Sequence, residues 1–168
     1  MQIIYISNRP KRLIETIGHV EKYMPFISEG IIVAPSKLHV YFNNFKCRIP
    51  FSIISEEDIT QQANNFHDLD HQSKNFFLRT NCAKQLDVRP EFIMSDDDAR
   101  PLRIIDEAYY RQDGRYHNYF YYDLARWRYG FNDFDIGQQN TYQVLKHLGM
   151  PHLSYASHMP QIINKKIF

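Results

Sequence analysis

The first hundred residues alternate short, apolar, β-rich runs with segments of helical periodicity, and this alternation limits the chain to few folds. Residues 2–7 read as a strand that stops before Pro10, a residue that is tolerated in the first turn of a helix. Apolar residues then recur at helical spacing up to Met24, and residues 30–35 read as a second, buried strand. A strand, a helix and a strand in this order favour a parallel sheet that is covered by helices.

The same alternation continues along the chain. Further elements are expected as strands at 39–42, 51–54 and 91–95 and as helices at 68–86 and 135–147. Ser55 precedes three acidic residues and can cap a short helical turn, whereas Gly149 closes the last helix. The sequence therefore predicts an α/β fold with a Rossmann-like, mostly parallel central sheet flanked by helices.

Length and composition bound the class of protein. With 168 residues, of which 43% are hydrophobic, the chain can bury one core, so we expect a single domain over 1–168. The chain has 20 Lys and Arg against 19 Asp and Glu, a formal net charge of +1, so no strong electrostatic field favours nucleic acid, membrane or acidic partners. Two cysteines without metal-ligand spacing fit a reducing cytoplasm, and no apolar stretch approaches the roughly 20 residues of a membrane helix.

Three adjacent aspartates, Asp96, Asp97 and Asp98, follow the apolar strand at 91–95 directly. Adjacent carboxylates repel one another unless a cation or a basic group lies among them. Since alternate side chains share a side of an extended chain, Asp96 and Asp98 can face one ion while Asp97 points elsewhere. Such oxygen ligands suit Mn²⁺ or Mg²⁺, and the alternative is a solvated acidic turn or a helix cap.

The segment from Phe92 to Asp98 resembles the DxD-type motif of glycosyltransferases with the fold called GT-A. These enzymes also begin with a strand-helix-strand unit, and the spacing of about ninety residues from first strand to acidic motif is similar. The resemblance implies a nucleotide-sugar-binding half over 1–100 and an acceptor half over 101–168. Because 168 residues is short for this family, two alternatives stay open: the acceptor-binding elements are trimmed, or the chain is a fragment.

Two further stretches extend the resemblance. Residues 78–83 are similar to the Ala-Arg-Asn helix segment that many GT-A enzymes place beside the donor, which implies that Arg79 contacts the diphosphate. His158 resembles the late histidine that completes the metal or phosphate site in this family, and the alternative is a histidine that packs on the last strand. Asn8 and Arg9 end the first strand and are expected to contact the base or diphosphate, as is Asp97.

The stretch that follows His158 looks most like the Stealth-type sugar-phosphate transferases, whose acidic motif is similar. The sequence has Gln161 where that group tends to carry a second histidine. Transfer of a whole sugar phosphate, or of a nucleotidyl group, therefore stays open beside glycosyl transfer.

Asp133 and Asp135 lie where the GT-A family often keeps an acidic residue facing the acceptor hydroxyl, so either could act as general base. The alternative for Asp135 is a helix cap. An aromatic segment over 109–134 could stack on sugar rings, and it could equally fill a core.

The expected function is transfer of a sugar from a nucleotide-diphosphate donor, with UDP-sugars as the first expectation, to an acceptor hydroxyl, with Mn²⁺ or Mg²⁺ as cofactor. A saccharide is the expected acceptor, and a modified DNA base, as for phage glucosyltransferases, is the alternative. From a different class, a non-catalytic carbohydrate-binding module stays open.

Overall fold

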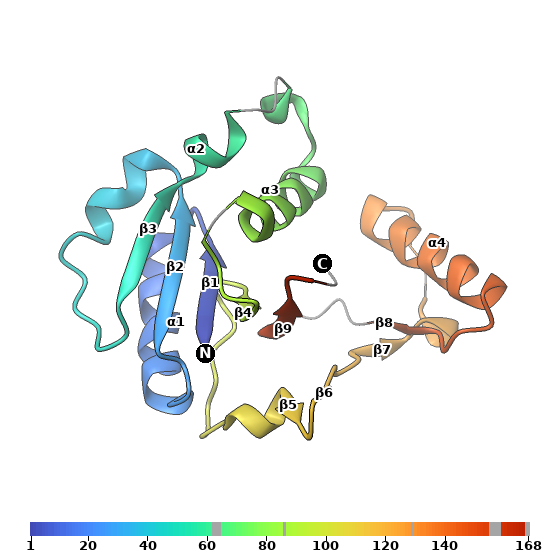
Figure 1. Cartoon of the computed structure of the whole chain (residues 1–168). Helices are drawn as coiled ribbons and strands as arrows, with labels where there is room; N and C mark the ends of the chain where they lie inside the picture. The colour runs from blue at the N-terminus through green and yellow to red at the C-terminus, as the bar shows by residue number, and fades with distance from the viewer. Residues whose placement is uncertain (62–64, 86, 129, 155–158, 167–168) are drawn as a thin grey trace. The chain divides into compact units, whose positions relative to one another are not determined.

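The structure is a computed structural model, and it describes residues 1–61, 65–85, 87–128, 130–154 and 159–166 (Figure 1). Its main sheet has five strands, which are β1 (Gln2–Ile6), β2 (Glu29–Ala34), β3 (Phe51–Ser55), β4 (Glu91–Ser95) and β9 (Gln161–Asn164). They lie in the order β3-β2-β1-β4-β9, in which the first four are parallel and β9 is antiparallel to β4. The mostly parallel sheet expected from the sequence is confirmed.

The chain lays these strands down in two directions from β1. It moves outward from β1 to β2 and β3, and then it crosses back to place β4 on the other side of β1. The strand order therefore reverses between β1 and β4. In open α/β sheets, such a reversal leaves a crevice at the carboxyl ends of the two strands, where ligands bind.

Helices cover both faces of the sheet, because successive side chains of each strand point to opposite faces. One core joins α1 (Pro10–Tyr23) to β1, through Ile3, Tyr5, Leu13, Ile17 and Val20. The other core joins α3 (His71–Gln85) to β1 and β4, through Ile4, Leu78, Cys82, Phe92 and Met94. Figure 1 shows α1 and α3 on opposite sides of the sheet.

Local chemistry explains where most elements begin. Pro10 opens α1, and the Ser55 side chain accepts a hydrogen bond from the backbone of Glu57 at the start of α2 (Glu56–Thr60). The helix α3 begins later than expected. The Asp70 carboxylate accepts a hydrogen bond of 2.9 Å from the Ser73 backbone, and a short 3-10 turn, η2 (Phe66–Asp68), precedes it.

The strand expected at 39–42 is wrong. Residues there belong to a 3-10 helix, η1 (Ser36–Tyr41). The outer edge of β3 is an edge of the described sheet, so a lack of available edges is not the cause. The backbone instead bonds locally: the amide of Leu38 donates to the carbonyl of Pro35 at 2.8 Å, and the amide of Phe42 donates to the carbonyl of His39 at 2.9 Å.

The later part of the chain consists of short elements before one long helix. They are η3 (Glu107–Tyr109), β5 (Arg111–Gln112), β6 (Arg115–Tyr116), β7 (Tyr122–Asp123), η4 (Leu124–Arg126), α4 (Asp133–His147) and β8 (Leu153–Ser154). The chain separates into two compact units: one comprises Met1–Tyr116 with β9, and the other begins at His117 and contains α4. None of the helices in the described part is long and apolar enough to cross a membrane.

Candidate active site

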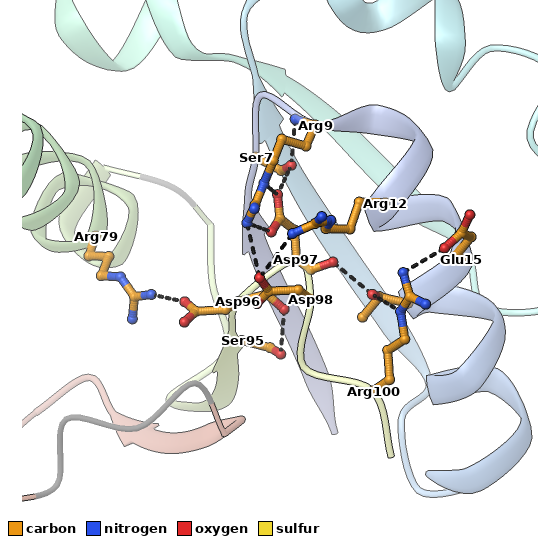
Figure 2. A network of polar contacts seen from close by, with 11 residues as sticks. Ser7, Arg9, Arg12, Glu15, Arg79, Ser95, Asp96, Asp97, Asp98 and Arg100 are labelled. Carbon is orange, nitrogen blue, oxygen red and sulfur yellow. Dashed lines mark hydrogen bonds and ion pairs between the residues drawn. The ribbon is translucent and has the colours of Figure 1, made fainter. Parts of the chain in front are cut away.

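The acidic run lies at the point where the strand order reverses. Tyr5 near the end of β1 pairs in register with Ser95 at the end of β4, so the two following loops are neighbours. The loop after β1 carries Ser7, Asn8 and Arg9, and the loop after β4 carries Asp96, Asp97 and Asp98. Residues about ninety positions apart are thereby brought together at one edge of the sheet (Figure 2).

Asp97 is turned into the protein, and only 4% of it is exposed. Its carboxylate accepts hydrogen bonds from the Ser7 hydroxyl and from both Nε and Nη2 of Arg9, the Nε contact being 3.0 Å. Its backbone carbonyl accepts a further bond of 2.7 Å from Thr16 of α1. The hydrogen bonds to the Asp97 carboxylate raise the pKa of Arg9. Asp97 thus ties together β1, α1 and the loop after β4.

Asp96 and Asp98 are more exposed than Asp97 and contact different cations. Arg79 of α3 donates through Nη2 to Asp96, and its Nε donates to Asn75 at 2.7 Å. Asp98 lies 3.4 Å from Nη2 of Arg9 and 3.4 Å from Nη1 of Arg12. The side chains of Asp96 and Asp98 are 25% and 31% exposed, so solvent and ligands can reach both. Figure 2 shows Asp96 pointing toward α3 and Asp97 toward the Ser7 side.

A cavity of about 530 Å³ opens at this edge. Its lining comes from the loops after β1 and β4, from the start of α2 and from one face of α3, and comprises Ile6, Ser7, Asn8, Arg9, Glu56, Phe66, His71, Lys74, Asn75, Leu78, Arg79, Asp96, Asp97 and Asp98. Burial raises the pKa of Glu56. The volume is in the usual range for sites that hold a small molecule or cofactor. Six candidates from the sequence therefore line one pocket: Asn8, Arg9, Arg79, Asp96, Asp97 and Asp98.

The carboxylates at this edge fit a hard divalent cation by their chemistry. In the described residues, no group of three or more His, Cys, Asp or Glu side chains is placed to hold a metal. Mg²⁺, however, is commonly bound through one or two carboxylates together with the phosphates of a substrate. Asp96 and Asp98 supply two such oxygen donors within the pocket, whereas both oxygens of Asp97 are engaged by Ser7 and Arg9.

The remaining candidates lie elsewhere. His158 is outside the described residues, so its role as a third ligand stays a prediction. Asp133 and Asp135 lie in the first turn of α4, in the second compact unit. Asp135 accepts hydrogen bonds of 2.8 Å from the Trp127 indole and 2.6 Å from Asn132, the residue that caps α4. Its contacts stabilise this helix start.

The sequence reasoning missed four groups that line the pocket or hold its charges. Glu56 follows β3 at the same carboxyl edge, and Lys74 and Asn75 lie on the face of α3 that carries Arg79. Arg12 lies in the first turn of α1, beside Asp98. The i,i+4 spacing of Asn75 and Arg79 was a usable signal, because residues at that spacing share one helix face.

The sheet order, the helices on both faces and the acidic loop at the reversal of strand order define a GT-A-like fold. Solved structures similar to this chain include two of the galactosyltransferase LgtC, one in complex with donor and acceptor sugar analogs and one of an active-site mutant. The two match with a TM-score of 0.56 at 15% and 14% identity, and each match covers 99% of this chain. This chain spans 58% of the length of those chains. No family model and no curated protein matches the sequence. The expected GT-A fold is confirmed.

Proposed function

We propose that this protein is a glycosyltransferase that uses a divalent cation, Mn²⁺ or Mg²⁺, to bind a nucleotide-diphosphate sugar, with UDP-sugars as the first candidates. The observation that supports this most strongly is the pocket at the reversal of strand order, where carboxylates and guanidinium groups lie side by side. Carboxylates suit the cation, and guanidinium groups suit the phosphates.

Each side of the pocket has a distinct task in this proposal. Asp96 and Asp98 would hold the cation, which offsets the charge that develops on the departing diphosphate. Arg79 donates hydrogen bonds to phosphate oxygens, since its planar guanidinium matches their geometry. Arg9 and Asn8 flank the diphosphate from the β1 side, while the contact of Arg9 with the buried Asp97 carboxylate keeps the two loops in register.

The sheet holds the hydrogen-bond donors of the pocket in fixed positions, and this rigidity favours the proposed reaction. Groups that are held in place before the substrate arrives stabilise developing charge without reorganising during the reaction. Asp97 contributes to this through its contacts to Ser7, Arg9 and Thr16 rather than through the substrate.

In this proposal, Asp133 or Asp135 takes the proton of the acceptor hydroxyl, and a saccharide is the expected acceptor. A cytoplasmic location stays a prediction.

The donor can be identified by calorimetric titration of the protein with a panel of nucleotide sugars, with and without Mn²⁺. We expect heat with one nucleotide class, and only in the presence of metal. The variants Asp96→Asn and Asp98→Asn should each weaken this binding by roughly tenfold or more, because contacts to charged groups are worth about 1.5–3 kcal/mol. Asp113→Asn, which removes an exposed carboxylate in the turn between β5 and β6, is the matched control.

Product analysis separates the alternatives. Release of nucleoside diphosphate with a glycosylated acceptor supports the proposal. Release of nucleoside monophosphate instead indicates transfer of a sugar phosphate at the same pocket. Binding of glycans alone, with no response to any nucleotide sugar in metal, identifies a carbohydrate-binding module and refutes the enzymatic reading.

A further inference from the structure

Arg79 is held between two side chains at the wall of the pocket. Its Nη2 donates to Asp96, and its Nε donates to the amide oxygen of Asn75, one helical turn earlier, at 2.7 Å. The Arg79 and Asp96 side chains are 33% and 25% exposed. The Arg79 guanidinium therefore contacts the Asp96 carboxylate, which the proposed function assigns to the divalent metal ion, and solvent reaches both groups.

The charges around the pocket are balanced without any ligand. Four carboxylates, Glu56, Asp96, Asp97 and Asp98, lie with four cationic side chains, Arg9, Arg12, Lys74 and Arg79. A divalent cation alone adds two positive charges to this count. The diphosphate of a nucleotide sugar carries two negative charges, so the cation and this diphosphate together leave the count unchanged, whereas either one alone does not. Uncompensated charge is costly where part of the surroundings is protein.

The two ion pairs nearest the β4 loop differ in how easily they can open. Asp97 is buried, and its carboxylate has three hydrogen bonds from Ser7 and Arg9, so removing it from Arg9 would leave a buried charge. The Arg79–Asp96 pair is partly exposed, and pairs of this kind contribute little free energy. Of these two, the Arg79–Asp96 pair is thus the one that a ligand can exchange. The contacts of Asp98 to Arg9 and Arg12, both at 3.4 Å, are longer and are also exposed.

We propose that Arg79 is an exchangeable cation that occupies Asp96 until metal and diphosphate arrive together. On binding, the guanidinium leaves Asp96 and turns to the phosphate oxygens, and the carboxylate becomes available to the metal. The ligand of this pocket is accordingly the neutral complex of a divalent cation with the doubly charged diphosphate of a nucleotide sugar, and each component strengthens binding of the other. This inference rests on the proposed function for the identity of the second ligand.

The sign of one mutational effect distinguishes this exchange from a purely structural ion pair. In Arg79→Met, Mn²⁺ should bind the nucleotide-free protein about tenfold more tightly, because a unit positive charge roughly 5 Å from a divalent ion in a water-like medium is removed. The same variant should lose most of the coupling between Mn²⁺ and nucleotide. In the wild type we expect uridine diphosphate to tighten Mn²⁺ binding by about 5- to 150-fold, the usual range of such coupling.

The experiment titrates Mn²⁺ into the 168-residue protein and measures free Mn²⁺ by its electron paramagnetic resonance signal, first without nucleotide and then with saturating uridine or guanosine diphosphate. Arg89→Met is the matched control, because Arg89 forms an exposed pair with Glu29 at the opposite end of the strands. It should leave both affinities unchanged. Circular dichroism verifies that each variant is folded.

Two additional variants keep the test decisive should Arg79→Met fail to fold. Arg79→Lys retains the charge and should keep Mn²⁺ affinity near the wild-type value. Asn75→Ala frees the Nε end of the guanidinium and should tighten Mn²⁺ binding, by less than Arg79→Met does.

The outcomes separate the two proposals. Unchanged or weaker Mn²⁺ binding in Arg79→Met, with nucleotide coupling present in the wild type, overturns the exchange and leaves the proposed function standing. Tighter Mn²⁺ binding in the variant, with no effect of either nucleotide on the wild type, overturns the proposed function and the coupling with it. Tighter binding together with lost coupling supports both.

Discussion

Replacing Asp97 by alanine tests whether this residue holds the two loops together. The change removes the partner of the Ser7 hydroxyl, which is buried, and of both nitrogens of Arg9. Leaving a buried polar group unsatisfied costs about 1–3 kcal/mol, and breaking a fully buried ion pair costs about 3–5 kcal/mol. Because the Arg9 side chain is 48% exposed and can be hydrated, the second figure is an upper limit here.

We therefore expect Asp97→Ala to lower the free energy of unfolding by about 2–3 kcal/mol. For a chain of this length, that corresponds to a decrease in Tm of about 5–10 °C. Urea denaturation followed by circular dichroism measures the free energy, and calorimetry measures the Tm. In a double-mutant cycle, Arg9→Met and Asp97→Ala should show a coupling of at least about 1 kcal/mol, since the two side chains are in direct contact.

Asp98→Ala is the matched control, since it removes a neighbouring carboxylate that is 31% exposed and lies 3.4 Å from its two arginine partners. Its cost should stay below about 1 kcal/mol, as for other exposed pairs. Equal destabilisation by the two substitutions would refute the assignment of Asp97 as the structural member of the run.

The other predictions concern α4 and the start of α2. Asp135→Ala should shift the fluorescence emission of Trp127, the sole tryptophan, to longer wavelength and destabilise α4 by about 1 kcal/mol. Asp133→Ala, in the same helical turn, should leave the emission spectrum unchanged. An unchanged spectrum in Asp135→Ala would contradict the contact between Asp135 and the indole. The Ser55 hydroxyl, with other donors, lowers the pKa of Glu57 from its ordinary value of 4.5 to about 2. The ionised Glu57 carboxylate therefore stabilises the fold fully above pH 4.5, and this contribution is lost as the pH falls to about 2. The difference in Tm between wild type and Glu57→Gln should therefore be constant above pH 5 and vanish near pH 2, and a difference that persists at pH 2 would exclude this cause.

Sequence reasoning succeeded where the signal is local. The apolar run at 91–95 predicts β4, and its junction with the aspartates places them at the carboxyl edge of the sheet. The alternation of side chains predicts correctly that Asp97 differs from its neighbours in burial, but not which side chains share a side: Nη2 of Arg9 contacts both Asp97 and Asp98, whereas Asp96 pairs with Arg79. The aspartates follow the strand in a turn, where the periodicity of an extended chain no longer holds.

The partners of the aspartates could not be predicted in the same way. Arg12 contacts Asp98 because β1 and β4 are adjacent and α1 starts beside them, which is a property of the strand order. The 3-10 helix at Ser36–Tyr41 was missed for another reason. The apolar residues of 39–42 favour a strand, but short-range backbone bonds, such as that from Phe42 to His39, satisfy this segment locally.

The strand β9 was missed for a related reason. It has four residues, and it pairs with β4 in the antiparallel sense, with Ile163 opposite Phe92. So short an apolar segment is ambiguous by itself, and its position depends on the edge that β4 leaves open.

The pairing of β9 with β4 also sets an order of events during synthesis. The two strands are separated by about seventy positions, so β4 emerges from the ribosome several seconds before its neighbour exists. During that interval its outer edge offers bare backbone donors and acceptors to any other extended chain. A nascent or truncated chain without residues 161–164 is therefore the form most prone to aggregate, and it is the form that a chaperone would have to shield.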